Sequence, residues 1–159
     1  MMKSLVCFYS RTGNSRGVGE QIAGELGADV EEIHEDSDRG RVLGFIGGII
    51  SGVLRRSAKI KPVEKDLSEY GLVVVGSPVW AGGVTPAVRA FLEENREMLG
   101  GCRIGCYCTY GGSPGKTFTQ MQELAGKTAM ATLGLSEKEI AKKEDGGKIR
   151  DFTAKLAGE

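Results

Sequence analysis

The chain has 159 residues and a mass of 16.9 kDa, which suits a single domain over residues 1–159. Its 21 basic and 21 acidic residues cancel, so we do not expect a nucleic-acid-binding protein that depends on a basic face. Glycine is in excess, with 25 residues, about twice its usual share. This excess indicates backbone used for close packing or for binding.

The cysteine content and the apolar stretches predict a cytoplasmic protein. Four cysteines are few for a secreted disulfide scaffold, and no leader with a cleavage site precedes the first apolar run. The longest apolar stretch, 42–54, has 13 residues, whereas a bilayer span needs about 20. We therefore expect no stable membrane insertion.

The first part of the chain predicts a strand, a turn, a helix and a second strand. Residues 3–9 form a nearly continuous apolar run, as in a strand covered on both faces. After the polar turn 10–15, an apolar stripe recurs every four residues up to Gly27, as in a helix, at Val18, Ile22 and Leu26. Residues 28–33 alternate apolar with acidic side chains and predict an exposed edge strand.

The middle of the chain predicts a second strand, loop and helix. Residues 72–76 are a buried-strand pattern, followed by a loop rich in glycine and proline. Thr85 suits an N-cap and Pro86 the first position of a helix. Gly100 closes the apolar stripe of this helix, which consists of Val88, Phe91, Leu92 and Leu99.

The remaining elements repeat the alternation. Residues 102–109 predict another strand, and a short helix carries Phe118, Met121 and Leu124. We expect a fifth strand near 128–133 and a closing helix with Ile149, Phe152 and Leu156. Alternating strands and helices predict an α/β fold with an open parallel sheet and right-handed crossovers. Ligands of such sheets bind beyond the carboxyl ends of the strands.

The turn 10–15 has three hydroxyl side chains, one amide and one glycine at the start of a helix. Unpaired N–H groups and the positive end of the helix dipole attract an anion there. The pattern fits a phosphate site and also an ordinary well-capped helix. It does not match the spacing of a nucleoside-triphosphate loop or of a dinucleotide fingerprint.

Two aromatic residues lie in the loops after the next two buried strands. Trp80, the sole tryptophan, and Tyr110 both stand beside paired glycines. Two such rings can flank a planar ligand, and the glycines let backbone groups approach its edge. Alternatively, each ring only covers the end of the sheet.

These three loops resemble those of the flavodoxin family. The resemblance is carried by residues 8–15 (FYSRTGNS), 76–83 (GSPVWAGG) and 108–112 (CTYGG), and it extends over most of the chain. It implies a three-layer flavodoxin-like sandwich, with helices on both faces of a five-stranded parallel sheet of order 2-1-3-4-5. Flavodoxins are a standard example of that order, with FMN at the switch point.

The resemblance also implies the residues that bind the cofactor FMN. In the first loop Ser10, Thr12, Asn14 and Ser15, with backbone amides around Gly13, would hold the phosphate. Arg11 departs from an uncharged phosphate loop; it pairs with the phosphate or points to solvent, and solvent is favoured. The isoalloxazine would lie between the second and third loops, with Trp80 and Tyr110 as ring neighbours. The residues of these two loops are Pro78, Val79, Trp80, Ala81, Gly82, Gly83, Thr109, Tyr110, Gly111 and Gly112.

A segment of about 30 residues, 36–66, separates the second and third expected strands, which is long for such a connection. Glycines recur in it every fourth residue, at Gly40, Gly44, Gly48 and Gly52. The favoured interpretation is an ordinary crossover helix on the sheet. A homodimer contact or a lid over the flavin are alternatives, and a lipid-surface contact is disfavoured.

The cysteines and the single histidine predict no catalytic or metal site. Cys102, Cys106 and Cys108 share parity, so an extended strand turns them to one face as small buried hydrophobes. Their spacing matches no metal motif. His34 lies among acidic residues and is expected to be solvated, and no Ser-His-Asp arrangement is formed.

Two functions are compatible with such a flavin site. The leading one is an electron-transfer protein that docks on redox partner proteins through an exposed flavin edge. The alternative is an FMN-dependent NAD(P)H oxidoreductase that reduces a small-molecule acceptor such as a quinone in a pocket formed partly by 36–66. The zero net charge argues against the electron-transfer protein, because it provides no field to steer a partner. The lack of a nicotinamide-binding motif argues against the oxidoreductase.

Overall fold

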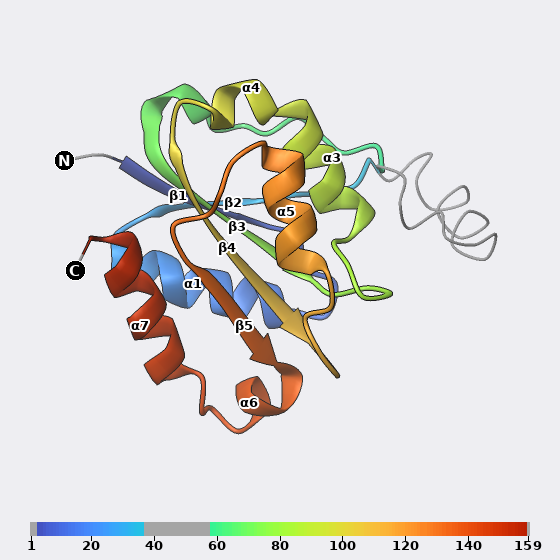
Figure 1. The fold of residues 1–159 in the computed structure, drawn as a ribbon, viewed down its shortest axis with the longest axis vertical. Helices are drawn as coiled ribbons and strands as arrows, with labels where there is room; N and C mark the ends of the chain where they lie inside the picture. The colour runs from blue at the N-terminus through green and yellow to red at the C-terminus, as the bar shows by residue number, and fades with distance from the viewer. Residues whose placement is uncertain (1–2, 37–57, 159) are drawn as a thin grey trace.

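The structure, a computed structural model, describes residues 3–36 and 58–158. Within these ranges, five parallel strands form one sheet of order β2-β1-β3-β4-β5 (Figure 1). This order confirms the predicted fold class and places β2 at an edge. The strands are β1 (Lys3–Phe8), β2 (Asp29–Glu32), β3 (Tyr70–Pro78), β4 (Arg103–Tyr110) and β5 (Thr132–Ser136).

Helices cover both faces of the sheet (Figure 1). The helices α1 (Asn14–Leu26) and α7 (Gly146–Leu156) lie side by side on one face. The other face carries α3 (Pro86–Glu94), α4 (Arg96–Leu99) and α5 (Thr117–Ala125). A short α6 (Glu137–Ala141) follows β5, and the 3-10 helix η2 (Leu67–Glu69) leads into β3.

The strands divide their side chains between two hydrophobic clusters, one for each face. Alternate residues of a strand point to opposite faces, so Cys7 belongs with Phe91 and Met121 of the α3–α5 layer. Its neighbour Phe8 belongs with Ile22 of α1 and the other residues of the α1–α7 layer. Coverage on both faces explains why β1 and β3 read as continuous apolar runs.

Two glycines make room for one buried aromatic residue beneath the start of α1. The side chain of Tyr107 is fully buried, and a Cβ at Gly76 would overlap its ring. A Cβ at Gly19 would lie 2.5 Å from the Tyr107 hydroxyl. That hydroxyl donates to the Ser15 carbonyl at 2.8 Å. Part of the glycine excess therefore serves close packing that fixes the position of α1.

Two predicted boundaries were wrong. The fifth strand begins at Thr132 rather than near 128. The helix α5 ends at Gly126, a left-handed glycine, and the connection from this helix to β5 continues through Met130. The Met130 N–H donates to the Ile104 carbonyl. The predicted helix that starts at Pro86 breaks at Asn95 before α4 begins. The side-chain amide of Asn95 donates to the Phe91 carbonyl at 2.8 Å. Such a local bond between a side chain and the backbone competes with continuation of the helix.

The long connection between β2 and β3 is seen only at its ends. Its predicted crossover helix lies outside the described residues. Glu35 and Ile60 form an antiparallel bridge that joins the two ends of the connection. Next to it, the Asp36 backbone N–H donates to the Lys59 carbonyl at 2.9 Å. Among the described residues, no helix has the length and apolar character to cross a membrane.

Candidate functional site

Three loops leave the carboxyl ends of β1, β3 and β4 and meet at one edge of the sheet. We define the first loop as residues 9–15, the second as 78–85 and the third as 109–116. The strands β1 and β3 are neighbours, but the chain continues from β1 to β2 on one side and from β3 to β4 on the other. The first and second loops therefore lie at a topological switch point of the sheet, where ligands of such folds bind.

The first loop turns directly into α1. Its Ser10 hydroxyl accepts a hydrogen bond from the Gly13 N–H at 3.1 Å. Gly13, at the N-cap, has a φ of 101°, and no side chain caps the helix. The first N–H groups of α1 consequently keep donor capacity at the positive end of its dipole. Thr12, exposed, and Asn14, half-buried, stand on the same turn. This arrangement can bind an anion.

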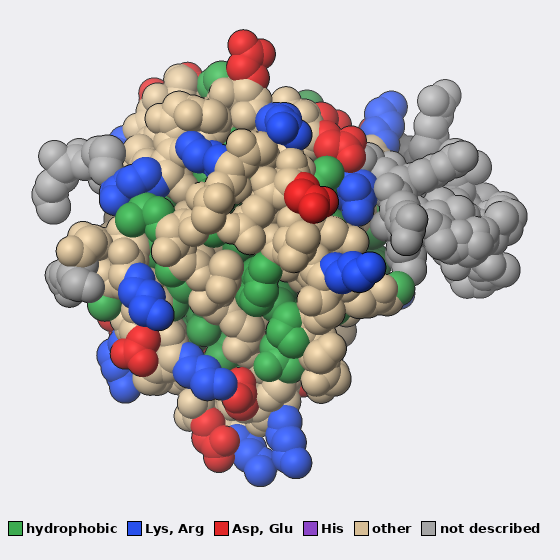
Figure 2. Space-filling model, viewed as in Figure 1, with side chains coloured by type: hydrophobic (Ala, Val, Ile, Leu, Met, Phe, Trp, Pro, Cys, Tyr) green, Lys and Arg blue, Asp and Glu red, His purple; other side chains and the backbone are tan. Residues whose placement is uncertain are grey.

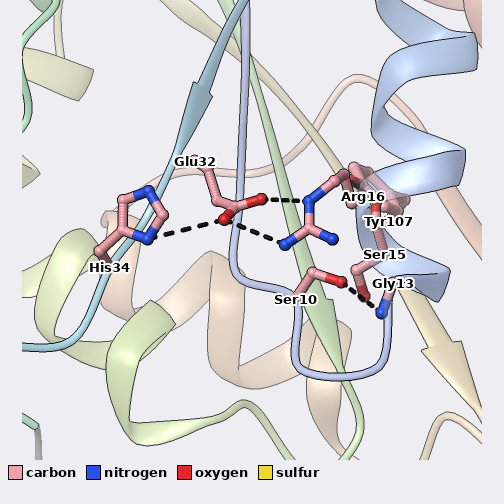
Figure 3. A network of polar contacts seen from close by, with 7 residues as sticks. All are labelled: Ser10, Gly13, Ser15, Arg16, Glu32, His34 and Tyr107. Atoms are coloured by element: carbon pink, nitrogen blue, oxygen red, sulfur yellow. Dashed lines mark hydrogen bonds and ion pairs between the residues drawn. The ribbon is translucent and has the colours of Figure 1, made fainter.

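Ser15 lies deeper than the rest of the first loop. Only 2% of the residue is exposed, and its hydroxyl is 2.9 Å from the Thr109 hydroxyl. This contact joins the first loop to the third. Together with the Tyr107 bond to the Ser15 carbonyl, this contact anchors the start of α1 to β4. Figure 3 shows Tyr107 and Ser15 close together at the start of this helix.

An ion pair braces the outer side of the first loop (Figure 3). Arg16 of α1 donates to both carboxylate oxygens of Glu32 at the end of β2, at 2.6 and 3.1 Å. The His34 Nδ1 lies 3.6 Å from the same carboxylate, with 58% of its side chain exposed. His34 is therefore solvated, as predicted. Because this pair is exposed, it contributes little to stability.

The second loop contains a strained turn. Trp80 and Gly83 exchange backbone hydrogen bonds of 2.9 and 3.0 Å, while Ala81 and Gly82 have φ values of 51° and 76°. Positive φ at both central positions defines a type I′ turn. A non-glycine residue in that region costs about 1–3 kcal/mol, so Ala81 must be held there by its surroundings.

The third loop and α5 hold this turn. The Lys116 N–H donates to the Gly82 carbonyl at 2.8 Å, and the Gln120 side chain accepts from the Val84 N–H at 2.9 Å. A Cβ at Gly115 would overlap the same Gly82 carbonyl, so only glycine allows the two loops to approach this closely. The second loop is thus fixed by contacts rather than left free.

Trp80 contacts the first loop. Its ring centroid is 5.8 Å from that of Tyr9, at an interplanar angle of 85°. The Arg11 guanidinium lies over the Trp80 ring, 5.4 Å from the centroid. Arg11 is exposed, as favoured from the sequence, but the structure adds a cation–π contact that the sequence did not predict.

Tyr9 also interacts with Glu35, which lies three residues beyond the end of β2. Burial, followed by the charge of Glu35 and a hydrogen bond with it, raises the pKa of Tyr9 to about 12. Its hydroxyl therefore remains protonated at neutral pH. Trp80 is therefore in contact with both a neutral phenol, from Tyr9, and a cation, from Arg11.

The third loop has an open side. Gly111 and Gly112 are exposed, and a Cβ at Gly112 would meet none of the described residues within 4 Å. The Tyr110 ring lies towards β5, where a Cβ at Gly134 would be 3.3 Å from it. Trp80, in the loop after β3, and Tyr110, at the end of β4, thus have different surroundings. Their joint contact with one ligand stays a prediction.

The four cysteines are buried free thiols, as expected for Cys102, Cys106 and Cys108. Cys7 lies in β1, Cys106 and Cys108 lie in β4, and Cys102 directly precedes β4. Burial raises the pKa of Cys106 and of Cys108 to about 12, and it also raises the pKa of Cys7. These thiols stay protonated at neutral pH and do not act as nucleophiles there.

Sequence reasoning missed three residues that shape the site. Tyr9 ends the first apolar run, so its place before the loop was a usable signal. Lys116 acts through its backbone N–H, a group that every residue except proline has, so its side-chain type gives no signal in the sequence. Gln120 stands next to the apolar position Met121 on α5, and no pattern in the sequence links it to the second loop.

No protein-family model matches the sequence, and no curated protein matches it. Solved structures do match. A flavoprotein from Lactobacillus acidophilus in complex with FMN shares 19% identity, with 89% of this chain and 98% of that chain covered and a TM-score of 0.69. The two-electron reduced flavodoxin from Megasphaera elsdenii shares 15%, with coverages of 97% and 99% and a TM-score of 0.62. A WrbA-like flavodoxin from Agrobacterium tumefaciens shares 14%, with coverages of 99% and 93% and a TM-score of 0.58.

The protein therefore has a flavodoxin-like α/β fold, and the predicted resemblance is confirmed at the level of the fold.

Proposed function

We propose that this protein binds FMN and transfers electrons through the bound flavin to redox partner proteins. The observation that carries this proposal is the mutual contact of three loops at the switch point of the sheet. Ser15 joins the first loop to Thr109 of the third, Arg11 joins the first to Trp80 of the second, and Lys116 joins the third to Gly82 of the second. The FMN complex of the Lactobacillus acidophilus flavoprotein, which has the same fold, supports the proposal.

The first loop fits the phosphate of FMN. A helix start without a side-chain cap keeps N–H donors for an anion, and Gly13 has a backbone conformation that other residues rarely adopt. We assign the phosphate to the side chains of Ser10, Thr12 and Asn14 and to these backbone amides. The Ser15 hydroxyl, which already has Thr109 as partner, would complete the floor of the site.

The second and third loops fit a planar ring. Trp80 is half-buried and held by two neighbours, so little conformational entropy remains to be lost when a ring stacks on it. The glycines at 82, 83, 111 and 112 let the backbone approach the ring edge. We assign the ring to Pro78–Gly83 and Thr109–Gly112. The bound flavin would supply the electron chemistry, while these residues bind and orient it.

A carrier is favoured over an enzyme because, among residues 3–36 and 58–158, nothing covers the side of the candidate ring site formed by Gly111 and Gly112. The zero net charge gives the protein no strong overall field to steer a partner. Figure 2 shows Lys and Arg side chains interspersed with Asp and Glu over the viewed face, in keeping with the zero net charge. We therefore expect partner docking that depends weakly on ionic strength.

An anaerobic mixing experiment tests the function. The FMN-loaded protein is mixed with NADH or NADPH, and flavin absorbance is followed. A carrier keeps its oxidised spectrum with either nucleotide, is bleached by dithionite and recovers its colour when an oxidised haem protein accepts the electrons. Rapid bleaching by NADH or NADPH followed by turnover with a quinone contradicts the carrier role and supports the NAD(P)H oxidoreductase.

A further inference from the structure

Arg11 stands out because it places a positive charge at the candidate ring site. Its guanidinium lies 5.4 Å from the centroid of Trp80, the ring neighbour assigned above. The side chain is exposed. Within residues 3–36 and 58–158, no carboxylate forms an ion pair with it. Its charge is thus not cancelled by a close partner in that part of the chain.

A negative charge also lies beside this aromatic pair. Glu35 is hydrogen-bonded to Tyr9, whose ring meets Trp80 edge to face. Both charges act on the Tyr9 hydroxyl, and they act in opposite directions. Arg11 is thus held at Trp80 of the second loop, and Glu35 is held at Tyr9 of the first loop.

Reduction changes the charge of a flavin ring. At neutral pH oxidised FMN takes up two electrons and one proton, so the ring gains one negative charge. A fixed cation beside the ring favours this reduced form, and a fixed carboxylate disfavours it. The charge of the surroundings thereby changes the ratio of the dissociation constants for oxidised and reduced FMN.

We propose that Arg11 determines the redox preference of the site by favouring the reduced, negatively charged flavin, with Glu35 as the opposing charge. This inference rests on the proposed FMN binding. Arg11 acts through its charge, and the stack on Trp80 holds that charge in place. The sequence supports a specific role, because Arg11 is the charged residue in an otherwise uncharged turn, 10–15.

The test is a redox titration of FMN-loaded variants with dithionite at low ionic strength, since an exposed charge is screened by salt. Arg11→Gln is expected to lower the ratio of oxidised to reduced dissociation constants about tenfold, which lowers the two-electron potential by about 30 mV. Arg11→Lys keeps the charge and stays within about threefold of the natural protein, or about 14 mV. Glu35→Gln shifts the ratio in the opposite direction.

Arg103→Gln is the matched control. It removes an exposed arginine at the start of β4, at the opposite end of this strand from the third loop, and should leave the ratio of dissociation constants unchanged. The difference between Arg11→Gln and the natural protein should also shrink in 1 M salt, which a purely structural role would not cause. An Arg11→Gln protein that binds FMN with an unchanged ratio overturns this inference and leaves the proposed function standing. An Arg11→Lys protein that behaves like Arg11→Gln also overturns it. A natural protein that takes up no FMN overturns both.

Discussion

The phosphate assignment predicts that one side chain distinguishes FMN from riboflavin. Thr12→Val keeps the shape of an exposed loop residue but removes its hydroxyl donor. The backbone N–H groups at the start of α1 remain, so a single hydrogen bond to a charged acceptor is lost. Such a bond contributes about 1.5–3 kcal/mol, which corresponds to an FMN dissociation constant raised about 10- to 150-fold.

Riboflavin lacks the phosphate, so its dissociation constant should change by no more than about twofold. Both ligands can be titrated by quenching of Trp80 fluorescence, because Trp80 is the only tryptophan of the chain. Thr119→Val, an exposed threonine on α5, is the control and should alter neither affinity. Equal weakening of FMN and riboflavin by Thr12→Val, or no weakening of FMN, would refute the reasoning.

Three further outcomes are expected. Trp80→Ala should weaken FMN and riboflavin alike, by about 0.5–1.5 kcal/mol for the lost ring contact, and selective loss of FMN in flavin-fluorescence titrations would contradict the ring assignment. Gly76→Ala should lower the free energy of unfolding by about 1–3 kcal/mol in urea titrations, because the added Cβ overlaps the buried ring of Tyr107. Gly24→Ala, where the added Cβ meets no described residue in α1, should raise that free energy by about 0.5–1 kcal/mol. Similar effects of the two substitutions would count against this packing. Above pH 9 the unfolded chain loses the protons of Cys106 and Cys108 while the folded chain keeps them up to about pH 12, so the free energy of unfolding should fall by about 1.4 kcal/mol per pH unit for each thiol. Cys108→Ala should reduce this slope between pH 9 and 10.5, and an unchanged slope would show that the thiol is not protected.

Elements with strong local signals could be predicted from the sequence. The strands β1 and β3 are buried on both faces, so their apolar runs are unambiguous. The Thr85 cap was equally clear, and its hydroxyl does accept from the Val88 N–H. The helix α6 has a comparable signal, a capping box of Ser136 and Glu139, which was overlooked because the segment lacks an apolar stripe.

Features that depend on distant contacts could not be predicted in the same way. The position of β5 is set by its register with β4, where Thr132 pairs with Cys106, and local propensity does not report that register. The three candidate loops were located from composition. The contact of Arg11 with Trp80, however, joins residues that are 69 positions distant in the sequence (80 − 11) and depends on the fold being formed.

The same limit applies to the strained turn of the second loop. The glycines at 82 and 83 indicate a turn, but alanine at 81 gives no sign of a positive φ. That conformation results from Lys116 and Gln120, which reach the turn from the third loop and α5. Local rules fail here because tertiary contacts at the candidate site override them.

The most direct test of FMN binding is reconstitution of the purified protein. Flavin is removed, FMN is added back, free ligand is separated by gel filtration, and the protein fraction is measured for visible absorbance and for Trp80 fluorescence. We predict one FMN retained for each chain, with the tryptophan emission quenched in proportion. A colourless protein fraction with unquenched Trp80 would contradict the account.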